Sequence, residues 1–133
     1  MNFEEKILTT CHIIAIVGLS SNPERPSHKV ASYLKEQGYR IIPVNPLEKS
    51  VLGEICYPDL ASIPEPIEVV DMFRRAEEAV AIVEQAIKVG AKVVWMQEEV
   101  TNEEAAALAR EAGLLVVMDK CMRKEHLKLT GKS

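Results

Sequence analysis

The segment IIAIVGLSSNPERPSH, residues 13–28, decides how the chain begins to fold. Its apolar run predicts a strand that is covered on both faces, and Gly18 then allows a tight turn. Pro26 suits the first turn of a helix, where a missing N–H costs nothing. A strand, a small polar loop and a helix N-terminus often bind phosphate, because free N–H groups and the helix dipole attract anions. A plain strand-to-helix turn is the alternative.

A glycine followed by a short apolar run occurs three more times. The runs are YRIIPVN after Gly38, AKVVWMQ after Gly90 and LLVVMDK after Gly113. Each glycine closes a stretch in which apolar residues have helical spacing, as expected at a helix C-terminus. The pattern predicts helices over 3–10, 27–37, 76–88, 102–112 and near 123–128, and strands over 12–17, 40–44, 67–72, 92–96 and 114–118.

Strands that alternate with helices predict parallel strands joined by right-handed crossovers. We therefore expect an α/β fold, a Rossmann-like, doubly wound parallel sheet of five to six strands with helices on both faces. The loop 45–66 allows a short edge strand near 55–57. The spacing from Thr101 to Glu104 is that of a capping box and predicts the start of the fourth helix. No domain boundary is visible, so residues 1–133 are expected to form a single domain.

Composition and charge argue against several classes of protein. Hydrophobic residues make up 47% of the 133 residues and charged ones 27%, an ordinary globular balance. A net charge of −4 argues against general affinity for nucleic acid. The first residues lack the basic segment with which a signal peptide begins. No apolar run approaches the ~20 residues of a membrane span. We therefore expect a cytoplasmic protein without membrane binding. Three cysteines without a CxxC pair predict reduced thiols and no metal site.

Two familiar nucleotide motifs are absent from the sequence. There is no GxGxxG, and Asn45-Pro46 stands where an acidic residue would bind the ribose of NAD. There is also no GxxxxGK[ST], so ATP hydrolysis of that kind has no support.

Ligands of a doubly wound sheet bind beyond the carboxyl ends of its strands. Five stretches of this sequence follow predicted strands, namely 18–27, 45–49, 73–75, 96–98 and 119–123. They carry the basic residues Arg25, Lys49, Arg74, Arg75, Lys120 and Arg123. A rim of cations on an acidic protein favours an anionic ligand, and the alternative for any single one is ordinary surface charge.

Four segments, taken together, resemble one protein family. They are VGLSSNPERPSHKVASYLKEQGYRIIPVNP at 17–46, VVDMFRR at 69–75, VVWMQ at 93–97 and VVMDKCMRKEH at 116–126. The set resembles the small stand-alone CoA-binding domain proteins, which are similar to the CoA-binding, Rossmann-like domain of the succinyl-CoA synthetase alpha subunit. The resemblance covers about residues 12–129. Its most specific parts are the Asn-Pro after the second strand and the Asp-x-Phe-Arg after the next.

The resemblance implies coenzyme A (CoA) or an acyl-CoA as the ligand. The residues it places at the ligand are Gly18, Ser20, Ser21, Asn22, Arg25, Ser27, Asn45, Pro46, Lys49, Phe73, Arg74, Trp95, Met96 and Gln97. The first loop would face the pyrophosphate. Phe73 and Arg74 would flank adenine and phosphates, and the last three residues would line the path of the pantetheine arm. Lys49 is displaced by one position from the lysine that follows Thr-Pro in the synthetase.

We expect a binding or regulatory module without a complete active site. The phosphorylated histidine of the synthetase lies in a second domain, for which this sequence has no counterpart, and we identify no catalytic residue. The alternatives are a nucleotide-dependent enzyme, either an acyl-CoA ligase component that needs a partner subunit or an NAD(P) oxidoreductase, and a redox regulator in which CoA modifies Cys121. The apolar helix faces also permit a homodimer.

Overall fold

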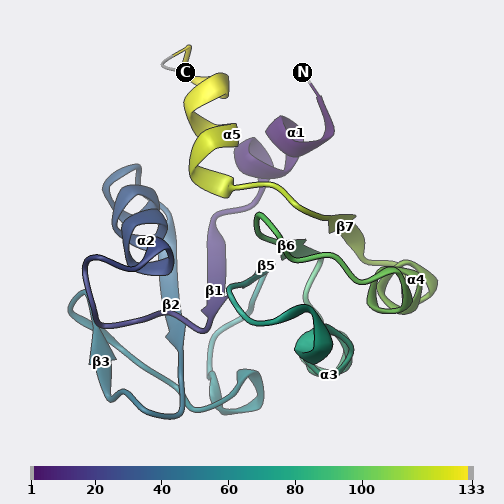
Figure 1. The fold of residues 1–133 in the computed structure, drawn as a ribbon, viewed down its shortest axis with the longest axis horizontal. Coiled ribbons are helices and arrows are strands. Elements are labelled where there is room, and N and C mark those ends of the chain that lie inside the picture. Colours follow the sequence, from purple (N-terminus) through teal and green to yellow (C-terminus); the bar gives the residue numbers. More distant parts are fainter. Residues whose placement is uncertain (1, 132–133) are drawn as a thin grey trace.

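A computed structural model describes residues 2–131 as five parallel strands flanked by helices (Figure 1). The strands of the sheet, in spatial order, are β2 (Arg40–Val44), β1 (Ile13–Val17), β5 (Val69–Met72), β6 (Val93–Met96) and β7 (Leu115–Val117). Every neighbouring pair is parallel. The predicted doubly wound α/β fold is therefore confirmed, with five strands in the sheet.

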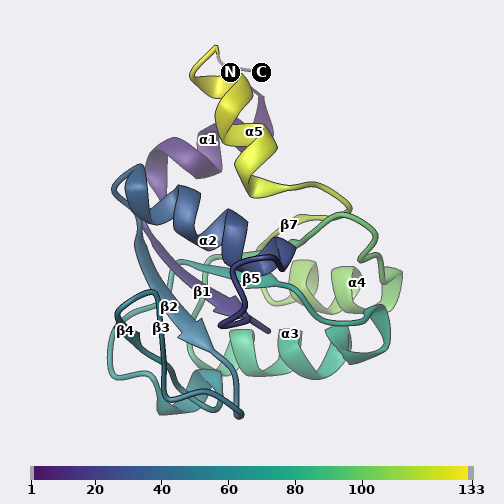
Figure 2. The same cartoon turned by 60° about the vertical axis from the view of Figure 1, so that its left-hand side comes forward.

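Helices cover both faces of the sheet, as predicted. The helices are α1 (Phe3–Thr10), α2 (Pro26–Glu36), α3 (Ala79–Lys88), α4 (Glu103–Glu111) and α5 (Met122–Leu129), and the short 3₁₀ turn Ala76–Glu78 precedes α3. Figure 2 shows α2 on one side of the strands and α3 with α4 on the other. Helices α1 and α5 lie side by side and complete the α2 face.

The two faces form two apolar cores because side chains alternate along each strand. Ile14 and Ile16 of β1 pack with α1, α2 and α5, whereas Ala15 packs with α3 and α4. The same alternation puts Trp95 in the first core and Met96 in the second. Since both faces are covered, the strands read as nearly continuous apolar runs.

The segment between β2 and β5 lies beside β2, the edge strand of the sheet. It contains β3 (Ser50–Val51) and β4 (Glu54–Ile55), which pair in antiparallel fashion, and the 3₁₀ turn Leu60–Ser62. Tyr57 then makes a single parallel bridge to Val44. The edge strand expected near 55–57 is thus reduced to β4 and that one bridge.

The order of the strands reverses at β1, which lies between β2 and β5. Helix α2 carries the chain from β1 to β2, and the remaining strands add on the other side. Val17 and Met72 are paired at the carboxyl ends of β1 and β5. The loops that begin at Gly18 and Phe73 therefore diverge from neighbouring points, which is the usual position of a ligand crevice.

Among the helices that residues 2–131 form, none combines the length and the apolar character that crossing a bilayer requires.

Candidate functional site

Two adjoining cavities lie at the carboxyl ends of the strands. The larger, of about 760 Å³, is bounded by the loop after β1, the first turn of α2 and the loops after β5, β6 and β7. The smaller, of about 350 Å³, lies between the loops after β1 and β2 and helix α3. Gly18 and Arg74 line both of them. We refer to the two adjoining cavities together as the crevice, and the volume of each lies in the range of small-molecule sites.

Gly18 is required where the two cavities meet. Its φ of 88° lies in the left-handed region, and its N–H donates to the carbonyl of Val44 at 2.9 Å. A Cβ at this position would stand 2.6 Å from the carbonyl oxygen of Phe73 and 2.8 Å from Cδ of Arg74. Any side chain would therefore push the loops after β1 and β5 apart.

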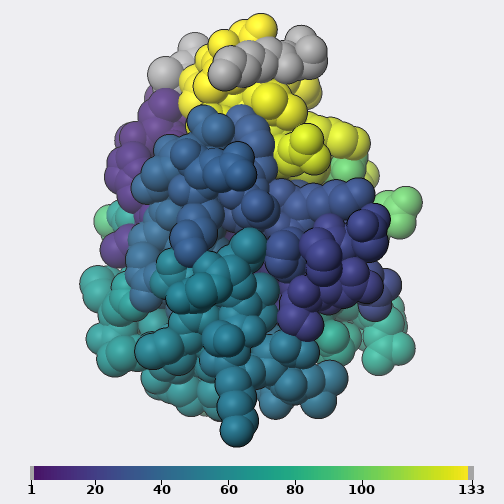
Figure 3. Space-filling view, turned by 90° about the vertical axis from the view of Figure 1, so that its left-hand side faces the viewer, coloured from purple at the N-terminus to yellow at the C-terminus, as the bar shows by residue number. Residues whose placement is uncertain are grey.

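Two serines hold the loop after β1 against the start of α2. Ser20 N–H donates to Oγ of the buried Ser27 at 3.0 Å, and Ser20 Oγ accepts from the N–H of Asn22 at 3.0 Å. Ser20 and Ser27 line the larger cavity, whereas Ser21 and Asn22 are exposed and line neither cavity. The space-filling view shows this loop at the surface beside α2 (Figure 3).

Three arginines give one end of the larger cavity a positive charge. Arg25 stands immediately before α2, and Arg74 and Arg75 follow β5. Arg74 forms an ion pair with Glu78 at 3.0 Å, yet 46% of its side chain stays exposed. The arginines lie close to the N-terminus of an 11-residue helix, so helix dipole and side chains attract the same anion.

The smaller cavity is shaped by the turn after β2. Asn45 Nδ2 donates to the carbonyl of Leu19 at 3.0 Å, and Asn45 Oδ1 accepts from the N–H of Leu47 at 2.9 Å. These bonds tie the turn to the loop after β1 and place Asn45 and Pro46 on the cavity wall. Lys49 is exposed and lines neither cavity.

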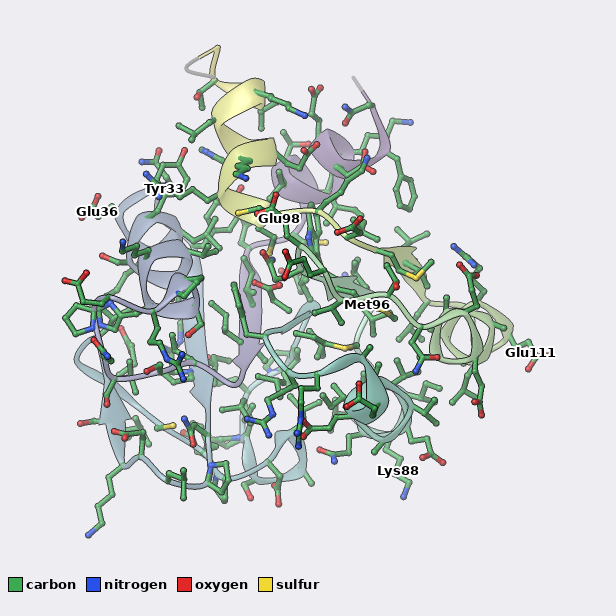
Figure 4. The ribbon with its side chains drawn as sticks, viewed as in Figure 1. Tyr33, Glu36, Lys88, Met96, Glu98 and Glu111 are labelled. Carbon is green, nitrogen blue, oxygen red and sulfur yellow. The ribbon has the colours of Figure 1, made fainter. Side chains whose placement is uncertain are left out.

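The far end of the larger cavity is acidic at its mouth and apolar below. Glu98, Glu99 and Asp119 line the mouth, and Glu99 N–H donates to Asp119 Oδ1 at 2.7 Å. Figure 4 places Glu98 beside the first turn of α5, where it pairs with Lys124 at 2.8 Å. The larger cavity is therefore polarised, with arginines at one end and carboxylates at the other.

Glu99 and Asp119 both have left-handed backbone, with φ of 70° and 57°. Residues other than glycine tolerate this region at a cost, and they concentrate at functional sites. The hydrogen bond between them joins the loops after β6 and β7 across the mouth of the larger cavity.

Trp95 and Met96 do not line the cavities, although Gln97 does. Trp95 is fully buried and its Nε1–H donates to the carbonyl of Lys120 at 2.8 Å. Met96 is also fully buried, and Figure 4 shows it inside the molecule. Trp95 thus holds the segment that leads into α5. Along the chain after β6, Gln97 is the first residue that lines the larger cavity.

Asp71 is the most unusual group near the cavities, and sequence reasoning placed it only as the first residue of the Asp-x-Phe-Arg motif, without a role of its own. It is fully buried in β5, and its Oδ1 accepts from Gln97 Nε2 at 2.5 Å. Burial raises the pKa of Asp71 to about 8. The signal was the acidic residue inside the otherwise apolar run VVDM, at a position where a sheet covered on both faces expects an apolar side chain.

Cys121 lines the larger cavity at the start of α5. Burial raises the pKa of its thiol, although N–H groups of the first turn of α5 act in the opposite direction. Cys11 and Cys56 are also buried, and all three thiols are free. Within residues 2–131, no three His, Cys, Asp or Glu side chains gather where they could hold a metal ion.

Two known proteins match nearly the whole chain. The uncharacterized protein YneT of Bacillus subtilis (strain 168) is 39% identical over 122 residues, which are 92% of this chain and 90% of that protein. A hypothetical protein from Pyrococcus horikoshii OT3 has a solved structure that matches with a TM-score of 0.94 and 49% identity, over 96% of this chain and 90% of that one.

A larger enzyme contains the same fold. The dinucleotide-forming acetyl-coenzyme A synthetase 1 of Ca. Korarchaeum cryptofilum, in its apo form, matches 84% of this chain with a TM-score of 0.74 and 21% identity. The match covers 26% of that enzyme. The family model of the CoA binding domain matches residues 12–127, almost the whole of the chain. The protein described here therefore belongs to the CoA binding domain family.

Proposed function

We propose that the protein binds CoA or an acyl-CoA in the crevice formed by the two cavities, and acts as a binding or regulatory module without a complete active site. The observation that carries the proposal is the sharing of Gly18 and Arg74 by both cavities. A ligand with a negatively charged centre and two different ends fits this arrangement. CoA has that form, with phosphates between an adenosine and a flexible arm.

The phosphates belong at the junction of the cavities. Gly18 lets them approach the backbone, and Arg25 and Arg74 supply charge-assisted hydrogen bonds, which are the strong ones. The loop held by Ser20 and Ser27 leads directly into the N-terminus of α2, which favours anions.

The adenosine belongs in the smaller cavity, beside Asn45 and Pro46. The arm belongs in the larger cavity, where Val30, Phe73 and Val100 offer an apolar path toward Gln97. Phe73, which the resemblance puts beside adenine, is reassigned to this path because it lines only the larger cavity. Of the other residues that the resemblance places at the ligand, Trp95 and Met96 are assigned a supporting role under this path, because they are fully buried. Ser21, Asn22 and Lys49 are assigned to the outer edge.

Calorimetric titration with CoA, dephospho-CoA and NAD tests the proposal. We expect CoA to bind, dephospho-CoA to bind more weakly because it lacks the 3′-phosphate, and NAD to bind poorly because the ribose-binding acid is absent. Equal affinity for CoA and dephospho-CoA would show that the site does not recognise the 3′-phosphate. No binding of CoA would end the proposal, and tight binding of NAD would favour an oxidoreductase.

A ligase component that works with a partner subunit is the second candidate. It is favoured by the match of this fold to about a quarter of an acetyl-coenzyme A synthetase. Purified protein that forms acyl-CoA from CoA, an acid and a nucleoside triphosphate only after a second subunit is added would support this candidate over a binding module.

A further inference from the structure

Asp71 carries the clearest feature near the crevice that binding of phosphates does not explain. It lies in the central strand of the sheet, where its register partners are Ile16 in β1 and Trp95 in β6. Its side chain is fully buried, and Oδ2 has no hydrogen-bond partner within residues 2–131. Apolar residues such as Val69 occupy the same face of β5. A valine would pack there at lower cost, so the carboxyl needs another reason.

The contact of Asp71 with Gln97 supplies that reason. Gln97 Nε2 donates to Asp71 Oδ1 at 2.5 Å, and the backbone carbonyl of Gln97 accepts from Val100 N–H at 2.9 Å. The side chain of Gln97 is therefore fixed by Asp71 and its backbone by Val100. Only 3% of the residue is exposed. With Nε2 engaged by Asp71, Oε1 is the acceptor that Gln97 can offer to the larger cavity, which it lines.

The surroundings of Gln97 limit what this oxygen can bind. The larger cavity has its arginines at the α2 end, whereas on the side of Gln97 the buried Val100 and Cys121 lie among exposed carboxylates, those of Glu98, Glu99 and Asp119. A carbonyl oxygen repels phosphate, which brings only acceptors, and it binds N–H and O–H donors. The fitting partner is therefore an N–H or O–H donor that carries no negative charge, and the secondary amides of a pantetheine arm are such donors.

We propose that Asp71 is a positioning residue, which fixes the side-chain amide of Gln97 so that Gln97 Oε1 accepts a hydrogen bond from a secondary amide of the ligand arm. This inference rests on the proposed function, since it names the part of CoA that the far end of the larger cavity recognises. The high pKa of the buried Asp71 agrees with it, because a neutral carboxyl can lie beside an amide without a cation.

Two ligands separate this role from a merely structural one. CoA contains the arm, and adenosine 3′,5′-bisphosphate lacks it. We expect Gln97→Met, which keeps the length of the side chain, to weaken CoA binding about fivefold to tenfold, the value of one neutral hydrogen bond. The bisphosphate should bind the variant as it binds the wild type. A structural role would change both affinities together.

Asp71 is tested by two variants and a double-mutant cycle. Asp71→Leu should weaken CoA binding as Gln97→Met does, and the double variant should be no weaker than either single one, because both changes remove the same contact. Asp71→Asn keeps an oxygen that accepts from Gln97 Nε2, so it should retain near wild-type affinity for CoA. If Asp71→Leu does not fold, the comparison of Asp71→Asn with Gln97→Met decides.

The failures of this inference and of the proposed function differ. Wild-type protein that binds neither ligand overturns both. If the wild type binds CoA, the proposed function stands, and three results would overturn the role of Asp71 alone. They are normal CoA binding by Asp71→Leu, a loss of affinity in Asp71→Asn as large as in Gln97→Met, and an equal weakening of CoA and bisphosphate binding by Gln97→Met.

Discussion

Gly18 and Phe73 lie so close that a Cβ on Gly18 would stand 2.6 Å from the carbonyl oxygen of Phe73. The ends of two neighbouring strands, β1 and β5, therefore approach each other closely beside the crevice. Gly18→Ala should therefore destabilise the protein by about 2–4 kcal/mol, from left-handed backbone strain and overpacking together. Urea unfolding monitored by circular dichroism measures the loss.

Gly90→Ala is the matched control for that variant. Gly90 also has positive φ, of 78°, but a Cβ there would meet nothing within 4 Å. It should lose only the conformational part, about 1–2 kcal/mol. Equal losses in the two variants would contradict the close contact between the loops after β1 and β5.

Arg74 is the cation that lines both cavities, so its removal should lower the affinity for CoA more than the removal of a cation elsewhere. Arg74→Gln should lower the affinity about tenfold or more, as for a hydrogen bond to a charged group. The loss should shrink as salt rises, because nearly half of the side chain is exposed. Calorimetry at two salt concentrations measures both effects.

Arg110→Gln serves as the control for Arg74→Gln. Arg110 lies in the last turn of α4, is exposed and lines neither cavity. Arg110→Gln changes the net charge by the same amount as Arg74→Gln. A similar loss of affinity for CoA in both variants would show that only the overall charge matters.

Much of the fold could be predicted because helix-ending glycines and apolar strands recur together. The predicted helix 3–10 and strand 40–44 have the bounds that the structure shows. The capping box expected from Thr101 is shifted, because Asn102 is the cap and its side chain accepts from Ala105 N–H. Thr and Asn both cap helices well, so spacing alone could not choose between neighbouring residues.

The site was predictable at the level of loops and less so at the level of side chains. Residues after the strand ends, such as Ser20, Asn45 and Arg74, line the crevice. Trp95 and Met96 still belong to β6, where side chains alternate between the two faces of the sheet, so each points into one of the two cores. The contact between Asp71 and Gln97 could not be predicted, because it joins β5 to the loop after β6, and sequence spacing does not reveal which side chains meet there.

The buried carboxyl of Asp71 should make stability depend on pH. Its pKa of about 8 in the folded protein lies well above that of an unfolded chain, near 4. The folded state therefore holds more protons between these values, and the stabilising contribution, full below about pH 4, is lost as pH rises toward 8. Asp71→Asn removes this dependence.

We expect the stability of Asp71→Asn relative to wild type to increase from pH 5 to pH 8, by on the order of 1 kcal/mol per pH unit. Urea unfolding of both proteins across this range gives the difference, in which other titrating groups cancel. Infrared spectroscopy of the wild type at pH 6 should show a protonated carboxyl band that the variant lacks. A constant stability difference would contradict a buried, protonated Asp71.

The thiols of Cys121 and Cys11 should respond differently to bound CoA. Cys121 lines the larger cavity, whereas Cys11 precedes β1, at the opposite end of that strand from Gly18. Burial raises the pKa of both thiols, so alkylation is slow in the free protein. CoA at about ten times its Kd leaves roughly a tenth of the sites empty. It should therefore slow alkylation of Cys121 about tenfold relative to Cys11, as measured by mass spectrometry of peptides after timed labelling. Cys11 reports the general stabilisation that any ligand brings, and equal protection of both thiols would place the bound ligand away from Cys121.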